Sequence, residues 1–144
     1  MFMSYFFDAD SGTVAPVRLR KTRACEDARE LIGCEQTDHV FLGSEHVVIF
    51  DDNGLVDGLS SVMQIEGVGT PLAASLVIAG IRFGELTTPL FSIDEVASRI
   101  DIMRPLLDMY QSEPAYSAVG FNIRVVKDKP RVLNSTPSHL KLVG

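Results

Sequence analysis

The sequence predicts a single small α+β domain, built mainly from antiparallel hairpins with two short helices and a C-terminal β-hairpin. Its 144 residues suit one domain, and 46% hydrophobic with 22% charged residues is ordinary globular composition. Short alternating apolar and polar stretches, separated by turn residues, are typical of strands joined by turns. We expect residues 1–112 to form an α+β body and residues 113–144 a hairpin extension.

The first two elements are expected to be an opening hairpin. Residues 2–7 are rich in aromatic side chains, which favours a strand. Residues 8–12 have the composition of a turn. Residues 13–20 then alternate between apolar and basic side chains, which is the period of a half-buried strand.

A helix is predicted over residues 23–33. Its apolar residues recur at helical spacing and form one stripe: Ala24, Cys25, Ala28, Leu31 and Ile32. Thr22 is the expected N-terminal cap, with Glu26 and Asp27 near the positive end of the helix. Gly33 stands where a left-handed C-terminal cap belongs.

Residues 40–50 are predicted to form a second hairpin with Gly43 and Ser44 as a two-residue turn. That turn places one set of side chains against the helix, namely Val40, Leu42, Val47 and Ile49. It places another set on the opposite face, namely His39, Phe41, His46, Val48 and Phe50. Because both faces are largely apolar, we expect the helix to cover one and a further chain segment or a second subunit to cover the other.

The middle of the chain predicts further strands and one capped helix. Asn53-Gly54 indicates a tight turn, with Leu55 and Val56 beginning the return strand. Strands are expected at residues 62–65 and 76–81, separated by a loop at 67–71. Ser92 and Glu95 fit a capping box, in which the serine side chain bonds an amide of the first turn and the glutamate reaches back.

Beyond this helix, Pro105 is expected to limit helical structure, with one more helical turn at 106–110. Residues 119–125 show the clearest alternation in the chain, which predicts a strand. Residues 131–133 are expected to return antiparallel to that strand, after a turn at 127–130. Residues 140–143 fit a last short strand.

Three stretches resemble a family of small proteins carried by bacteriophages, plasmids and their proteobacterial hosts, described as domains of unknown function. They are Leu31-Ile32-Gly33-Cys34-Glu35, the strand and turn from Val47 to Leu55, and the segment from Ile65 to Gly80 containing Pro71-Leu72-Ala73. Asn53 replaces the family's acidic residue and Ala74 its glycine. The resemblance implies a small antiparallel α+β domain from a mobile-element setting, and it implies no activity.

Charge and composition exclude several classes of function. The net charge of −6 argues against duplex nucleic acid as a partner, because that binding needs Lys and Arg to displace counterions. The longest run without charge or Pro, residues 72–81, is too short for a membrane span, and no basic region opens a signal peptide. Cys25 and Cys34 are expected to be free thiols in a reducing cytoplasm.

No motif for catalysis, metal or cofactor binding is present. Cys34, His39 and His46 could be neighbours, but their spacing matches no zinc motif. The loop at 67–70 lacks the Lys and the helix of a phosphate-binding loop. Neither cysteine has a histidine partner that the sequence can assign. We therefore expect no metal, no cofactor and no enzymatic activity.

The sequence is compatible with two functions. The first is a non-enzymatic accessory protein of a phage or plasmid, which binds a host or element protein and forms a homo-oligomer, most simply a dimer. Its predicted interface consists of Phe41, His46, Val48 and Phe50. The alternative is a protein that binds or sequesters a small molecule or nucleotide. Its predicted ligand-binding residues are Gly67, Gly69, Thr70, Arg82, Arg99 and Arg104.

Overall fold

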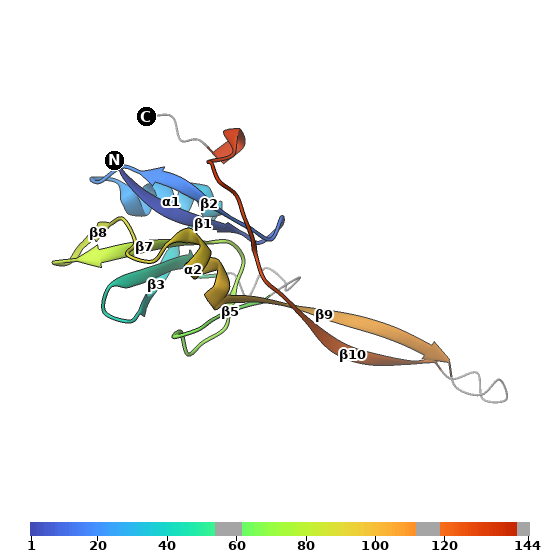
Figure 1. Cartoon of the computed structure of the whole chain (residues 1–144). Helices are drawn as coiled ribbons and strands as arrows, with labels where there is room; N and C mark the ends of the chain where they lie inside the picture. Colours follow the sequence, from blue (N-terminus) through green and yellow to red (C-terminus); the bar gives the residue numbers. More distant parts are fainter. Residues whose placement is uncertain (54–61, 112–118, 141–144) are drawn as a thin grey trace.

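The computed structural model describes residues 1–53, 62–111 and 119–140. The predicted α+β class is confirmed, with mainly antiparallel strands (Figure 1). The helices are α1 (Ala24–Ile32) and α2 (Ile93–Arg99), and a 3-10 turn, η1, spans Ser138–Leu140. The strands are β1 (Phe2–Asp8), β2 (Thr13–Leu19), β3 (Thr37–Leu42), β4 (His46–Asp51), β5 (Val62–Ile65), β6 (Leu72–Ala73), β7 (Leu76–Arg82), β8 (Glu85–Thr87), β9 (Ile100–Gln111), β10 (Val119–Asp128) and β11 (Arg131–Val132).

The strands form two sheets. The larger has the order β11-β2-β1-β7-β4-β3, with β8 also paired to β7, and the smaller has the order β10-β9-β5-β6. The predicted opening hairpin is confirmed, since β1 and β2 pair from Phe2↔Leu19 to Asp8↔Thr13. The strands predicted at 62–65 and 76–81, and the loop between them, are also confirmed.

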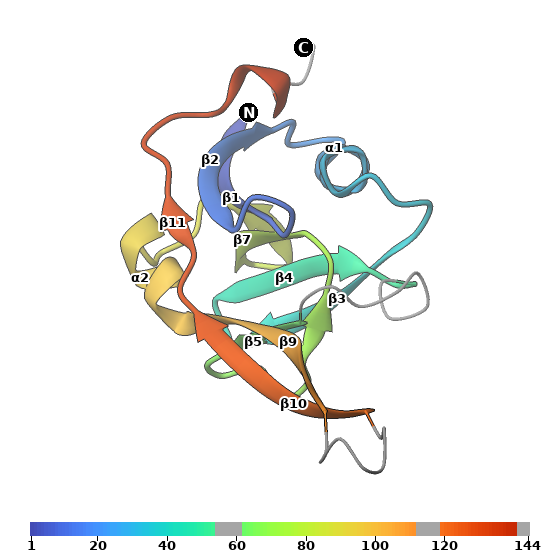
Figure 2. The same ribbon diagram turned by 90° about the vertical axis from the view of Figure 1, so that its right-hand side faces the viewer.

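Two apolar clusters cover opposite faces of the larger sheet. Figure 2 shows α1 on one side of this sheet and the smaller sheet with α2 on the other. One packs α1 against β1, β2, β4 and β7, and includes Phe6, Ile49 and Val77. The other packs α2, β5 and the base of β9 against the same sheet, and includes Val48 and Ile78. The sequence predicts that both faces of the β3–β4 hairpin are covered. The chain itself covers them, with α1 on one face and the smaller sheet and α2 on the other.

The caps of α1 are confirmed at one end only. Gly33 has a φ of 78° and its N–H bonds the Arg29 carbonyl, as a left-handed C-terminal cap does. The prediction that Thr22 caps the N-terminus is wrong. Arg23 occupies the cap position without a side-chain hydrogen bond to the helix backbone, and its guanidinium instead pairs with Glu26. The start of the helix is held through Asp27 rather than through an N-terminal cap.

The predicted register of the β3–β4 hairpin is wrong by one residue. Leu42 pairs with His46, so the connection has three residues, starting at Gly43 with a φ of 67°. A one-residue shift sends side chains to the opposite face. One face therefore carries Val40, Leu42, His46, Val48 and Phe50, and the other carries His39, Phe41, Val47 and Ile49.

The turn predicted at Asn53-Gly54 lies only partly within the described residues. Asn53 N–H donates to Asp51 Oδ1 at 2.9 Å, a turn stabilised by an aspartate side chain. Gly54, Leu55 and Val56 lie outside the described residues.

Helix α2 begins as predicted but is followed by a strand. Ser92 Oγ accepts a hydrogen bond from Glu95 N–H at 3.2 Å, while the Glu95 carboxylate pairs with Arg99 instead of reaching back. The helical turn predicted at 106–110 is wrong, because β9 runs unbroken from Ile100 to Gln111. Its pairing with β10 along ten residue pairs, including Pro105↔Val125, decides the extended conformation.

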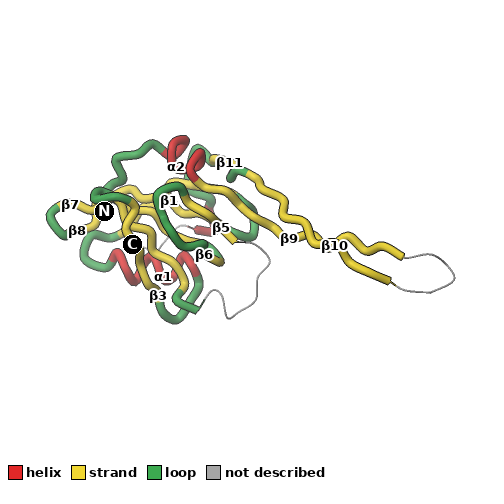
Figure 3. The backbone as a smooth tube through the Cα atoms, turned by 90° about the horizontal axis from the view of Figure 1, so that it is seen from below, coloured by secondary structure: helices red, strands yellow, loops and turns green. Residues whose placement is uncertain are grey.

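The strand predicted at 119–125 is confirmed as part of β10, but the hairpin predicted within residues 113–144 is wrong. β10 pairs with the preceding β9, and the two strands form an arm that projects from the body (Figures 1 and 3). Residues 131–133 do not return along β10. β11 runs parallel to β2, held by Arg131 N–H to the Gly12 carbonyl and Leu133 N–H to the Val14 carbonyl. The sequence predicts a last strand at residues 140–143. Leu140 belongs to η1 instead, and residues 141–143 lie outside the described part of the chain.

Candidate functional site

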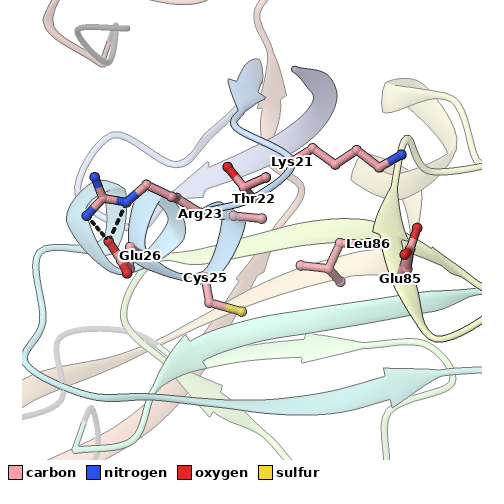
Figure 4. A pocket seen from close by; sticks show the side chains of 8 residues that line it. Lys21, Thr22, Arg23, Cys25, Glu26, Glu85 and Leu86 are labelled. Carbon is pink, nitrogen blue, oxygen red and sulfur yellow. Dashed lines mark hydrogen bonds and ion pairs between the residues drawn. The ribbon is translucent and has the colours of Figure 1, made fainter.

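The N-terminus of α1 stands over one end of the larger sheet and leaves a hollow there. A cavity of about 420 Å³ lies between α1 and the β7–β8 hairpin, lined by Lys21, Thr22, Arg23, Cys25, Glu26, Glu85 and Leu86 among others (Figure 4). Charged groups rim this cavity: Lys21 and Glu85 come from opposite sides, and Arg23 is paired to Glu26.

A smaller, more apolar cavity of about 170 Å³ adjoins it, and we call it the helix-side cavity. The two cavities share Cys25 and Leu86. The apolar lining of the helix-side cavity comes from four strands: Phe41 from β3, Val47 and Ile49 from β4, Ile81 from β7 and Leu86 from β8. It therefore opens along the helix face of the sheet and reaches β3.

A buried ion pair holds α1 above these cavities. The Asp27 side chain is fully buried in α1 and accepts hydrogen bonds from the Arg20 backbone N–H at 2.8 Å and from the Arg20 guanidinium at 2.5 Å. The Arg20 hydrogen bond lowers the pKa of the Asp27 carboxyl below its ordinary value. A buried charge needs such pairing, so this contact fixes the start of α1 to the end of β2.

A third cavity, of about 300 Å³, lies on the opposite face of β3, and we call it the acidic cavity. Asp38, Asp51 and Asp52 line it, together with apolar groups of Val40, Phe50 and Leu72. It shares Asp38 and His39 with the helix-side cavity. Strand β3 is thus flanked by a cavity on each face.

Strand β3 is also an edge of the larger sheet. Within residues 1–53, 62–111 and 119–140, β4 is the single strand that pairs with it. Phe41 is 53% exposed on the helix face of this strand, and the His39 ring lies edge-on to it at 5.5 Å. An edge strand offers unpaired backbone groups that can pair with another chain.

The predicted interface set does not form one surface. Val48 and His46 are buried in the chain's own core, His46 with 1% exposure, and the corrected register puts Phe41 on the other face. His46 Nε2 instead accepts hydrogen bonds from the backbone N–H groups of Leu90 and Phe91, at 3.1 and 3.2 Å. The His46 ring stacks on Phe91 at 4.1 Å, and burial lowers the pKa of His46.

The residues predicted for a small-molecule site lie apart. Arg82 lies over the Phe83 ring at the end of β7, Arg99 packs on Phe91 and pairs with Glu95, and Arg104 lies beside Gly12. Gly67 and Gly69 belong to the loop before β6, where Thr70 lines the acidic cavity. The Arg99 backbone lies beside this loop, since its carbonyl accepts a hydrogen bond from Glu66 N–H at 2.9 Å, but its guanidinium contacts Phe91 and Glu95.

The same register separates the three residues weighed for zinc. His39 and His46 project on opposite faces of the β3–β4 hairpin. Cys34 follows the C-terminal cap of α1, where burial raises the pKa of its thiol. Among the described residues, no group of three or more His, Cys, Asp or Glu side chains is arranged to hold a metal ion.

Tertiary structure does bring one cysteine and one histidine to the same cavity. Cys25 and His39 both line the helix-side cavity, and the His39 Nδ1 is 4.0 Å from Asp38 Oδ1. Nucleophilic catalysis by a Cys–His pair requires a hydrogen bond between the thiol and the imidazole. Across the described part of the chain, no such bond joins the Cys25 thiol to a histidine.

Sequence reasoning missed Phe83. The β7–β8 hairpin pairs Arg82 with Glu85, so Phe83-Gly84 is a two-residue turn in which both residues have positive φ, 51° and 76°. That backbone suits Asn or Gly and is unusual for a bulky residue. Phe83 is also 93% exposed, so packing does not explain it. The Phe-Gly pair after the apolar run 76–81 is the signal that the sequence contains.

We predict that Phe83→Asn stabilises the chain by about 0.5–1 kcal/mol, because asparagine tolerates the left-handed conformation better. Urea unfolding followed by circular dichroism measures the change. Phe83→Leu, which keeps an apolar side chain and removes no strain, is the control. A Phe83→Asn protein less stable than the original would show that the exposed ring stabilises the fold.

In the described part of the chain, neither helix has the length and apolar character needed to cross a membrane. Compared with known proteins, the chain matches no family model, no curated protein and no solved structure.

Proposed function

We propose that this chain is a non-enzymatic protein-binding domain, whose binding surface is the β3 edge together with the helix-side cavity. The observation that carries the proposal is an edge strand bearing a half-exposed phenylalanine beside an apolar cavity. Exposed large apolar groups next to a concave surface are typical of interaction sites. The resemblance to phage- and plasmid-borne proteins supports a host or element protein as the partner.

The alternative of a small-molecule or nucleotide binder receives less support. An anionic ligand would need convergent cationic groups, and Arg82, Arg99 and Arg104 lie at three separate places. Two of these guanidinium groups already contact other side chains. Arg82 lies over the Phe83 ring, and Arg99 lies over the Phe91 ring and pairs with Glu95. Self-association as a dimer stays a prediction, which sedimentation of the intact chain measures.

The proposed function is tested by selecting binders from a library of displayed random linear peptides on the intact chain. We expect enriched sequences whose binding falls at least about tenfold with Phe41→Asp, because loss of a central aromatic contact commonly costs this much. Val125→Asp is the matched control, since Val125 is similarly exposed, at 58%, but lies on β10.

Thermal melting of both variants and of the original chain is compared first, so that loss of binding is read only from variants that remain folded. Absence of any enriched peptide, or equal loss of binding in Phe41→Asp and Val125→Asp, would contradict the proposal.

A further inference from the structure

We infer that the partner segment binds as an added strand along the edge of β3, and that it carries apolar and basic residues at alternate positions. This inference rests on the proposed function and names the chemistry of its partner. It follows from the direction of the β3 backbone groups, from the two cavities that flank the strand, and from the charge of one of them.

Among the described residues, the backbone of β3 presents groups without a backbone partner at regular intervals. Asp52 N–H donates to the Gln36 carbonyl across the β3–β4 ladder at 3.1 Å. Hydrogen-bonded pairs alternate along an antiparallel ladder, so residues 36, 38, 40 and 42 face β4. The backbone N–H and C=O groups of Thr37, His39 and Phe41 therefore point to the free edge.

One of these outward groups is capped by a side chain that a new strand can displace. His39 N–H donates to the Asp38 carboxylate at 2.8 Å, and this contact is exposed. An incoming carbonyl would replace that carboxylate on the His39 N–H. Asp38 would then be free to contact a basic side chain of the partner.

The two cavities suit successive side chains of an added strand. Alternate side chains of a strand point to opposite faces of the sheet, and the helix-side and acidic cavities lie on opposite faces of β3. In strand addition, main-chain hydrogen bonds supply affinity, and pockets for alternate side chains supply specificity.

Each cavity selects a different kind of side chain. The helix-side cavity, lined by Phe41, Val47 and Ile49, suits an aliphatic or aromatic residue. The acidic cavity carries Asp38, Asp51 and Asp52, and in the described part of the chain none of these carboxylates pairs with Lys or Arg. A Lys or Arg at every second position supplies the complementary charge.

The same charges disfavour a second copy of this chain at the edge. β3 has the sequence TDHVFL, which contains Asp38 and no Lys or Arg, so a second copy of this strand would bring no cation to the acidic cavity and would add its own carboxylate. A basic segment of another protein is therefore the occupant that the edge favours.

The test uses a capped octapeptide with valine at alternate positions and lysine between them, and a control in which glutamate replaces each lysine. Binding to the intact chain is measured by fluorescence anisotropy at low and high salt. We expect the lysine peptide to bind about tenfold more tightly, and Asp51→Asn/Asp52→Asn to remove most of the difference, because two or three exposed ion pairs account for it. Asp94→Asn, on α2, is the matched control.

Amide hydrogen exchange by NMR reports the binding mode. With the lysine peptide we expect the amides of His39 and Phe41 to be protected about tenfold or more, while those of Asp38 and Val40, already directed at β4, change little. Selected peptides that bind without protecting His39 and Phe41, or equal binding of both octapeptides, would overturn the inference while leaving the proposed function standing. A free protein that sediments as a dimer with these two amides already protected would assign the edge to a second copy, and would also overturn it.

Discussion

Gly80→Ala is expected to destabilise the chain by about 2–3 kcal/mol, the cost of overpacking a buried site. Gly80 is buried in β7 between His46 of β4 and Thr87 of β8. A Cβ atom there would lie 2.5 Å from the Thr88 carbonyl oxygen and 3.2 Å from Pro89 Cα. Both contacts are backbone, so the segment 88–91 would have to move as a unit.

Urea unfolding of Gly80→Ala measures this effect. Gly69→Ala is the control, because a Cβ at Gly69 meets nothing within 4 Å and its backbone does not require glycine. Equal midpoints for the two variants would show that segment 88–91 shifts at little cost. It would then not be fixed against the sheet as the structure places it.

His46→Leu is expected to cost about 2–4 kcal/mol, because it leaves the N–H groups of Leu90 and Phe91 without their acceptor. It also removes the ring that stacks on Phe91. The segment would retain the Tyr5 hydroxyl bond to the Phe91 carbonyl, at 2.8 Å. His46→Gln keeps an acceptor oxygen, so it should restore part of the loss.

His46 also gives the stability a pH dependence with a definite sign. Burial is the main cause that lowers the pKa of His46 in the folded chain, and the Arg99 charge adds to it, while Glu45 and Glu95 oppose it. The unfolded chain takes up a proton at His46 as the pH falls below about 6.5, and the folded chain resists it. The contribution of His46 to the free energy of unfolding is therefore fully present above that pH. It declines as the pH falls from there to the pKa of His46 in the folded chain.

Urea unfolding at pH 7.5 and 5.5 measures this decline, with up to about 1 kcal/mol expected from His46. The same comparison in His46→Gln removes the contribution of this one histidine. An identical pH dependence in the two proteins would mean that His46 is protonated equally easily in the folded and unfolded states.

Local sequence determined the elements whose signals come from neighbouring residues. The alternation of 13–20, the aromatic run of 2–7, the stripe of α1 with Gly33 at its end, and the Ser92 cap all depend on contacts within a few residues. These interactions are available to the chain before it folds. The α+β class and the antiparallel character of the sheets followed from them.

Tertiary structure decided the pairing partners and therefore the candidate site. The β3–β4 register depends on a third loop residue, Glu45, and moves His46 into the core while leaving Phe41 outside. Residues 106–110 are extended because β10 pairs with them, although their own sequence is compatible with a helix. The parallel pairing of β11 with β2 joins residues more than a hundred positions apart.

The sequence by itself thus determined the fold class, most element positions and the absence of any recognisable catalytic motif. The structure alone decided which strand ends the larger sheet and which cavities flank it. The physical reason is that a free edge and a shared cavity are properties of the whole arrangement of strands. Asp38, Asp51 and Phe41 acquire their proposed roles only once β4 has paired with β3 on one side, while no strand of the described residues pairs with its other side.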